Sequence, residues 1–356
     1  MAAPVPLNPT HEGLSLKTKI VYALPRLACS LFSLHISSKA RKYYTDGEPG
    51  ISPTTLAMLV ATLKCADLLI AMVVGYWSDN MQSKYGRRKP FIAVGAPLWC
   101  LSVIMLCLAP SGLSAGAYVW YFGFFYFCYY SVGWSATIIP YDALAMELTT
   151  DYTERASLFG YKGMFQMVGY IMWAAVGIMF ALVYPNDVKA QVLIPALLFA
   201  GVVLLAFMLL LAVVDEPNVV EQQATSKEAD DGLVPMVRRM FRNPIYINYL
   251  KFKAPASMAF EIPVSVVAYY VQYSVRDTNP NAVQSFVTVA VVGGAILAIP
   301  LVVKLTAKYD KAVVLFTFLF CYGILLSLTV LVPFSTADKY RDRRIFVKTW
   351  ISLHTL

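Results

Sequence analysis

The sequence predicts an all-α fold, a polytopic bundle of membrane-spanning helices. Three observations predict it: 58% of the 356 residues are hydrophobic, the mean hydropathy is +0.60, and the 14% of charged residues fall between long apolar stretches. Soluble domains contain only about 45–50% apolar residues. We therefore expect an integral, multi-pass membrane protein whose immediate partner is the lipid bilayer, in either the plasma membrane or an organelle membrane.

Nine apolar stretches approach the roughly 20 residues that a helix needs to cross a bilayer. Lipid offers the backbone no hydrogen bonds, so each stretch must be a helix; barrel strands would alternate with a period of two. The expected spans cover residues 18–40, 53–78, 90–109, 117–146, 156–184, 190–214, 245–274, 282–304 and 312–333. A tenth apolar stretch, Ile345–Leu356, is too short to cross.

Basic residues in the short loops orient the bundle. With the N-terminus in the cytoplasm, the loops on that side carry most of the Lys and Arg, and Lys39, Arg41, Lys42, Lys189 and Arg276 face the opposite side. The chain then divides into a cytoplasmic tail (1–17), an N-terminal six-helix half (18–214), a polar cytoplasmic linker (215–243) and an incomplete C-terminal half (244–356) with spans seven to nine and a partial tenth.

Composition also argues against other classes of protein. The net charge is +8, but the basic residues are spread over several loops, so we expect no nucleic-acid partner. The six cysteines lie in apolar stretches without CxxC spacing or a histidine cluster, which predicts no metal site. No paired carboxylates or nucleophile constellation lies at membrane depth, so we expect neither an enzyme nor a cofactor.

The loop after the second span carries the most specific motif. Residues 75–90 read G-Y-W-S-D-N-M-Q-S-K-Y-G-R-R-K-P. This stretch resembles the major facilitator signature G-x-x-x-D-x-x-x-x-x-x-G-R-R-x-P, in length and in position. Further matches, in the correct order, are Tyr44-Thr-Asp46, Ile139-Pro-Tyr141, Asp151 to Arg155, Asn243-Pro244 and Tyr269-Tyr270. Together they are similar to the glycoside-pentoside-hexuronide cation symporters, the group of the melibiose carriers.

The resemblance implies the major facilitator fold with twelve spans. We therefore expect the chain to be a C-terminally truncated member with six N-terminal helices and an incomplete second half. The family works as a monomeric secondary transporter, which moves a small-molecule substrate by rocking two helical halves around a central cavity.

The resemblance also implies a charge lock at the cytoplasmic side, with Asp79, Gly86, Arg87 and Arg88 as members. Gly86 permits a tight turn, and Pro90 can begin the next helix. Positive-inside topology alone would also account for the basic residues. A second group, Glu147, Asp151 and Arg155, is expected to form an ionic link between the ends of spans four and five, or only to terminate these helices.

Ionisable groups inside a span are functional candidates by default, because they are costly in lipid. Asp67 matches the first of two carboxylates with which the family's cation-coupled members bind sodium or a proton. The second position is Ala71, which favours a co-transported proton, or no ion, over sodium. Lys64, one turn from Asp67, either neutralises it or leaves it free to titrate.

The other candidates for binding substrate or cation are Asp142, Lys162 and His35. Asp142 stands where melibiose carriers have a tryptophan that stacks on the sugar, and Lys162 adjoins the position of the family's arginine in span five. His35 is either a proton relay or a histidine hydrogen-bonded in a helix contact. We expect a transporter of a small polar, sugar-like solute; a lysophospholipid transporter and a non-transporting membrane sensor or scaffold are the alternatives.

Overall fold

The computed structural model describes residues 14–216, apart from 47–49, 82, 111, 150 and 186, then 233–251 and isolated positions between 253 and 324. The described secondary structure is helical throughout, without a strand, so the all-α class is confirmed for these residues. Expected spans seven to nine lie almost wholly outside the described residues. The division of the chain into its four parts stays a prediction.

Helices occupy each of the first six expected segments. The first is continuous through α1 (Leu16–Leu34), a π-helical stretch η1 (His35–Ala40) and α2 (Arg41–Asp46). The next two are α3 (Pro53–Asn80) and α4 (Lys89–Leu108). The fourth joins α5 (Ala115–Phe127), π-helical η2 (Cys128–Trp134) and α6 (Ser135–Leu148). The fifth and sixth are α7 (Tyr152–Val183) and α8 (Val188–Val213).

The helix starts follow local chemistry. The hydroxyl of Ser15 accepts a hydrogen bond from the backbone N–H of Thr18 at 3.1 Å, and Ser52 does the same for Thr55 at 3.1 Å. Each serine satisfies one of the N–H groups that a first helical turn leaves without a partner. Pro53 then occupies the first turn of α3, where its missing N–H costs nothing.

Two helices differ from the sequence expectation. The first span runs six residues further than residue 40, because Lys39 and Lys42 continue the helix and bury their side chains instead of joining a loop. Within the stretch expected to be a polar linker, α10 (Leu233–Arg242) forms a helix. In its sequence, LVPMVRRMFR, the three arginines fall at positions 238, 239 and 242, which places them on one face of a helix, as in an amphipathic helix.

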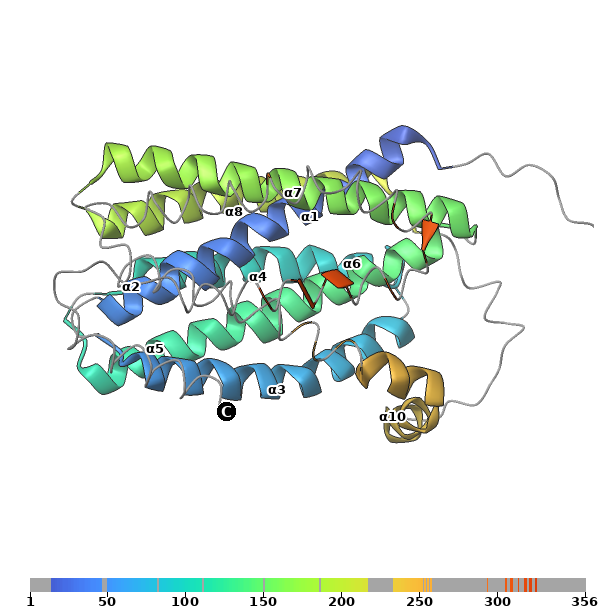
Figure 1. Ribbon diagram of the computed structural model, residues 1–356, viewed down its shortest axis with the longest axis horizontal. Coiled ribbons are helices and arrows are strands. Elements are labelled where there is room, and N and C mark those ends of the chain that lie inside the picture. Colours follow the sequence, from blue (N-terminus) through green and yellow to red (C-terminus); the bar gives the residue numbers. More distant parts are fainter. Residues whose placement is uncertain are drawn as a thin grey trace, which may run out of the picture.

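The helices from α1 to α8 run side by side along the long axis of the molecule, and the short α10 lies near one end of α3 (Figure 1). α7 and α8 pack on α1 and α4 along one side, and α3 packs on the α5, η2 and α6 segment along the other. Among the residues that the structure describes, five helices are long and apolar enough to cross a membrane, and many large apolar side chains, such as Leu69, Leu182 and Met208, are exposed on them.

Aromatic residues fill the centre of the bundle. Trp99 of α4 is fully buried and contacts the ring of Phe32 edge-on, with ring centroids 5.2 Å apart. The backbone of η2 approaches Trp99 so closely that a Cβ added at Gly133 would lie 2.6 Å from Trp99 Cβ and 2.7 Å from its Cα. Small residues at such crossings let helices pack closely within a membrane.

We predict that Gly133→Ala destabilises the bundle by about 1–3 kcal/mol, because the Trp99 backbone cannot move aside as a flexible side chain could. The matched control is Gly116→Ala on α5, where an added Cβ has no neighbour within 4 Å. Thermal unfolding of the detergent-solubilised variants measures both. Equal melting temperatures for the two variants would show that α4 and η2 do not pack as described.

Candidate functional site

An ion pair lies between α6 and α7 inside the bundle. The Lys162 ammonium donates to the Asp142 carboxylate, and its side chain is only 10% exposed, whereas that of Asp142 is 44% exposed. The same ammonium lies 5.1 Å from the ring centre of Tyr141 and 5.3 Å from that of Phe159. Lys162 is therefore held from one side by a carboxylate and from the other by aromatic faces.

Arg26 of α1 reaches the same face of α7. Its Nε donates to the amide oxygen of Gln166 at 3.3 Å, and the amide nitrogen of Gln166 donates to the hydroxyl of Tyr170 at 2.6 Å. Gln166 follows Lys162 by one helical turn, so the two side chains are neighbours. Sequence analysis named Asp142 and Lys162 as candidates for binding substrate or cation. The structure places Arg26, an ionisable residue of the first span and so also a candidate, beside them and adds the neutral residues Gln166 and Tyr170.

A reciprocal pair of tyrosines fixes α1 against α6 at this point. The hydroxyl of Tyr22 donates to the carbonyl of Tyr141 at 2.9 Å, and the hydroxyl of Tyr141 donates to the carbonyl of Tyr22 at 2.7 Å. The two rings stack with centroids 4.7 Å apart. Arg26 lies one turn after Tyr22, and Asp142 directly follows Tyr141. The tyrosine pair therefore positions the helices from which both charged residues extend.

Asp67 lies in a second polar group, between α3 and the span that contains η2. The hydroxyl of Ser135 donates to the Asp67 carboxylate at 2.7 Å. Lys64, one turn earlier on α3, places its ammonium 5.2 Å from the ring centre of Tyr130. The two candidates thus lie on one face of α3, as their spacing predicts, and the carboxylate has a hydroxyl ligand from the neighbouring span.

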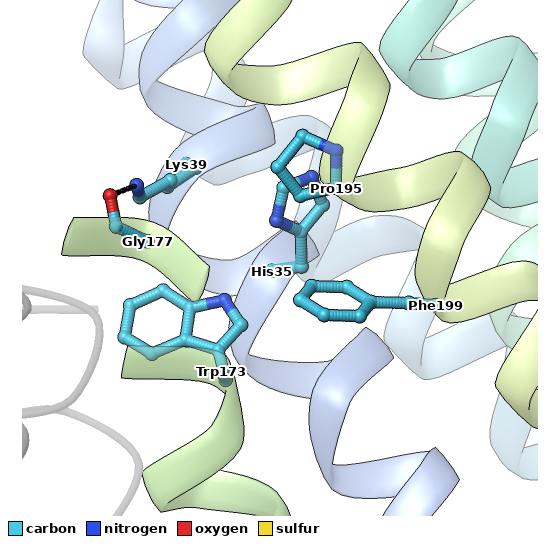
Figure 2. Close-up of a pocket in the computed structure, with 6 residues that line it drawn as sticks. All are labelled: His35, Lys39, Trp173, Gly177, Pro195 and Phe199. Carbon is cyan, nitrogen blue, oxygen red and sulfur yellow. Dashed lines mark hydrogen bonds between the residues drawn. The ribbon is translucent and has the colours of Figure 1, made fainter. Parts of the chain in front are cut away.

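His35 lies apart from these groups, where the first span contacts α8. Its Nε2 is 2.8 Å from the carbonyl oxygen of Val192, and its ring meets Phe199 edge-on at 5.6 Å. Figure 2 shows the crevice that it lines together with Lys39, Trp173, Gly177, Pro195 and Phe199. These side chains pack so closely that the crevice has no room even for a water molecule, so it is not a ligand pocket, which would enclose roughly 300–1,000 Å³. This geometry matches a histidine hydrogen-bonded in a helix contact.

Lys39 is a buried cation that sequence analysis placed at the very end of the first span, facing the side opposite the N-terminus. It is 4% exposed, donates to the carbonyl of Gly177 at 3.4 Å and lies 5.9 Å from the ring centre of Trp173 (Figure 2). A signal was present, because Lys39 and His35 are four residues apart and share a helix face. The basic run that follows Lys39 concealed the continuation of the helix.

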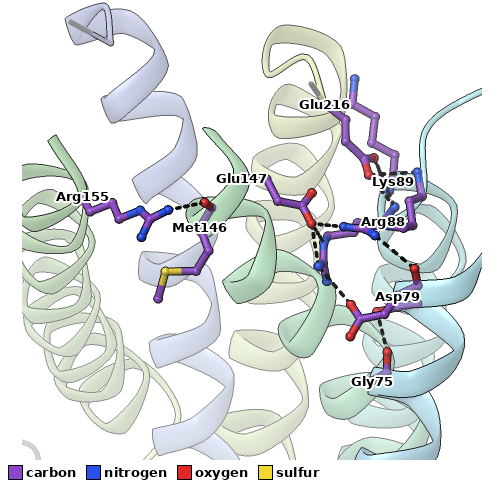
Figure 3. A network of polar contacts seen from close by, with 10 residues as sticks. Gly75, Asp79, Arg88, Lys89, Met146, Glu147, Arg155 and Glu216 are labelled. Carbon is purple, nitrogen blue, oxygen red and sulfur yellow. Dashed lines mark hydrogen bonds and ion pairs between the residues drawn. The ribbon is translucent and has the colours of Figure 1, made fainter. Parts of the chain in front are cut away.

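At one end of the bundle, two arginines converge on one carboxylate. Arg87 and Arg88 both donate to Oε1 of Glu147, Arg88 from Nε at 2.7 Å and from Nη2 at 2.6 Å. Arg88 also pairs with the Asp79 carboxylate at 3.0 Å, and Arg87 donates to the Asp79 carbonyl at 3.1 Å (Figure 3). The structure therefore joins Asp79, Arg87, Arg88 and Glu147 in one network across α3, α4 and α6.

Glu216, just after α8, holds the turn that precedes α4. Its carboxylate accepts hydrogen bonds from the backbone N–H groups of Arg87, Arg88 and Lys89 at 2.9–3.3 Å (Figure 3). A carboxylate at a helix N-terminus is favoured by the helix dipole. Gly86 has φ +102°, and an added Cβ there would collide with Glu216. Sequence analysis predicted the tight turn at Gly86 but missed Glu216, which it assigned to the linker.

Arg155 acts at the end of α6. Its guanidinium donates to the carbonyls of Thr149 at 2.7 Å and Met146 at 2.9 Å, and its backbone N–H donates to the carbonyl of Asp151 at 3.0 Å. An arginine bonded to the last carbonyls of a helix satisfies acceptors that the helix leaves open. Glu147 thus pairs with the loop arginines, while Arg155 and Asp151 shape the turn between α6 and α7.

Comparisons with known proteins identify the family. Residues 21–344 match the profile described as MFS/sugar transport protein. The chain belongs to this family. This match confirms the resemblance to the major facilitator family. The protein is therefore an integral, multi-pass membrane protein.

Its relatives include symporters. It is 20% identical over 304 residues to the uncharacterized symporter YjmB of Bacillus subtilis, covering 85% of this chain and 64% of that protein. It is 24% identical over 309 residues to a putative sulfoquinovose importer of Escherichia coli, covering 85% and 63%. It is 24% identical over 168 residues to a sodium-dependent lysophosphatidylcholine symporter of Danio rerio, covering 47% and 31%. The chain thus spans less than two thirds of the length of these relatives.

The fold has a solved counterpart. The crystal structure of a D-xylose-proton symporter superposes with a TM-score of 0.54 at 15% identity, over 81% of this chain and 69% of that one. This similarity confirms the major facilitator fold. Within the described residues, no group of three or more His, Cys, Asp or Glu side chains is arranged to hold a metal ion.

We predict that Glu147→Gln lowers stability by about 2–3 kcal/mol, since it removes a charged acceptor shared by two guanidinium groups. Glu154→Gln is the control; Glu154 forms one ion pair, with Lys19 at 2.8 Å, and its side chain is 25% exposed. Loss of this ion pair should lower the free energy of unfolding by no more than about 1 kcal/mol. Melting temperatures in detergent compare the two. A control that melts as low as Glu147→Gln would contradict the central role of Glu147.

Proposed function

We propose that this chain is a secondary transporter of a small polar, sugar-like solute and works by alternating access. The observation that carries the proposal is the partly open Asp142–Lys162 ion pair between α6 and α7, with Arg26 on the adjacent face. Charged groups are costly at membrane depth and mark substrate pathways there. The carboxylate and the ammonium can respectively accept hydrogen bonds from solute hydroxyls and donate to their oxygens.

Family membership and the relatives support a sugar-like solute. The two relatives that match 85% of the chain are called a symporter and a putative sulfoquinovose importer. A lysophospholipid is the second candidate, because lysophosphatidylcholine symporters match 47% of the chain. The shorter match supports it less. In either case we assign Asp142 and Lys162 to substrate binding.

We assign ion coupling, to a proton or sodium, to Asp67. Its carboxylate lies at membrane depth and accepts a hydrogen bond from the hydroxyl of Ser135 on the neighbouring span. Substitution of that carboxylate by an amide would remove the proton-binding and sodium-binding group while keeping its shape. Ala71 supplies no second carboxylate one turn away, and this supports a proton over sodium.

We assign the cytoplasmic gate to Asp79, Arg87, Arg88 and Glu147, with Gly86 allowing the turn and Asp151 and Arg155 shaping the neighbouring one. All the described members of the network lie at one end of the bundle. Within the described residues, no group bonds to the buried Oε2 of Glu147. That oxygen can accept a different partner when the gate rearranges.

The first test of this function is uptake by the purified protein in proteoliposomes, with a panel of radiolabelled hexoses, pentoses, hexuronates and lysophosphatidylcholine. We predict that Asp142→Asn reduces uptake of the transported compound by about tenfold or more, because Lys162 loses its charged partner at membrane depth. Asp215→Asn, at a fully exposed carboxylate, should transport like the wild type. Undiminished uptake by Asp142→Asn would remove Asp142 from the site. No uptake of any compound by the wild type would favour a sensor or scaffold.

The second test separates coupling from substrate binding. We predict that Asp67→Asn no longer accumulates solute in response to a proton or sodium gradient, but still exchanges labelled for unlabelled solute at near the wild-type rate. Only the ion-dependent step needs the carboxylate. Uptake assays with imposed gradients, beside counterflow assays without them, measure the two steps. Gradient-driven accumulation that survives in Asp67→Asn would assign coupling to another residue.

A further inference from the structure

Arg26 is a cation without a carboxylate partner in the described part of the chain. No Asp or Glu among the described residues lies within ion-pair distance of it, and its one hydrogen bond to a side chain goes to the neutral amide of Gln166. A guanidinium has five N–H donors, and only Nε is used here. Its terminal nitrogens, which form the fork suited to an oxoanion, remain available.

The Gln166 amide is itself held in place. Its nitrogen donates to the Tyr170 hydroxyl at 2.6 Å, so its oxygen faces Arg26. This arrangement orients the guanidinium without neutralising it. A neutral orienting partner is what a binding site for an anion requires, because a carboxylate in the same place would compete with the ligand.

Arg26 and Lys162 lie close to each other. Lys162 and Gln166 are one turn apart on α7, and Gln166 contacts Arg26. The hydrogen-bonded pair of Tyr22 and Tyr141 also joins α1 to α6, one turn before Arg26 and directly before Asp142. Among the described residues, this group contains two cations and one carboxylate, and Asp142 is already paired with Lys162. Arg26 therefore carries a positive charge that no described carboxylate balances, in a segment where a single charge costs about 2.5–3.5 kcal/mol on insertion scales.

From this imbalance we infer that the transported solute carries one anionic oxoacid group, and that Arg26 binds it with Lys162 as the second cation. The inference rests on the proposed transport function and narrows its substrate class. A carboxylate, a sulfonate or a phosphate monoester of a sugar-like molecule presents the paired oxygens that a guanidinium fork binds. The neutral part of the solute is then left to groups such as Asp142 and Tyr170, which can bond to hydroxyls.

The test compares matched neutral and anionic solutes in proteoliposomes that contain the purified full chain. The probes are D-glucose, D-glucuronate, a hexose 6-sulfonate and glucose 6-phosphate. We expect the wild type to take up at least one anionic probe and to discriminate against D-glucose by tenfold or more. Uptake of D-glucose equal to or above that of every anionic probe would overturn the inference but leave the transport function standing. No uptake of any probe or of other sugars would count against both.

Variants of Arg26 test its role directly. Arg26→Gln should raise the KM for the anionic probe by roughly 10- to 100-fold, the effect of losing charge-assisted hydrogen bonds. Arg26→Lys keeps the positive charge but loses the forked pair of N–H donors. Its KM for the anionic probe should therefore lie between the values of the wild type and Arg26→Gln. Lys189→Gln removes one positive charge at an exposed position on α8 and is the control. An unchanged KM in Arg26→Gln would overturn the assignment.

A thermal-shift measurement of binding distinguishes a loss of solute binding from a folding defect. The anionic probe should raise the melting temperature of the detergent-solubilised wild type and Lys189→Gln, and D-glucose should not. If Arg26→Gln is poorly folded, the comparison is made with Arg26→Lys, which retains the cation. A melting shift by D-glucose that matches the shift by the anionic probe would show that charge does not select the solute.

Discussion

The cost of placing charge in hydrocarbon governs the arrangement of this bundle. Four charged side chains inside the described spans each have a specific neighbour: a carboxylate and two aromatic rings for Lys162, a hydroxyl for Asp67, an amide for Arg26, a carbonyl and an indole for Lys39. A charge without any neighbour would be expelled toward water or neutralised. The helices therefore cross where these partners can meet, and the polar groups in turn select one packing of otherwise interchangeable apolar surfaces.

Aromatic and small residues make those meetings possible. The Tyr22 and Tyr141 pair joins α1 to α6 through two hydrogen bonds to carbonyls, and Gly133 lets η2 lie against Trp99. Because lipid provides no hydrophobic drive between helices, close packing and such hydrogen bonds hold them together. The tyrosine pair lies one turn before Arg26 and directly before Asp142 in the chain. The packing of α1 on α6 therefore fixes the positions from which these two charged side chains extend.

Sequence alone predicted the helices well and the partners poorly. Hydropathy located the first six segments because long apolar runs leave the backbone no alternative in lipid. It ended the first span too early, since Lys39 and Lys42 look like loop residues until their burial is known. It grouped Glu147 with Asp151 and Arg155, as an ionic link or as the residues that end two helices, whereas in the structure Glu147 bonds to arginines 59 and 60 positions away. Contacts of that separation depend on helix packing, which local patterns do not encode.

The same limit applies to the substrate group. The spacing of Lys64 and Asp67 on one helix was readable from the sequence, but the contacts of Asp67 with Ser135 and of Arg26 with Gln166 join different spans. Asp142 and Lys162 were each recognised through family positions, and their pairing was not. A cavity between two helical halves is a property of how helices are assembled, so single positions indicate it only through their chemistry.

The contact of Glu216 with the start of α4 has a consequence for how the chain can vary. The Glu216 carboxylate accepts hydrogen bonds from the backbone N–H groups of residues 87–89, and these groups do not depend on which side chains the three residues carry. Substitution of Arg87 or Arg88 can therefore change the ion pairs with Glu147 and Asp79 while the contact between Glu216 and the start of α4 is kept. The strength of this ion-pair network and the connection between the end of α8 and α4 are thus open to independent variation.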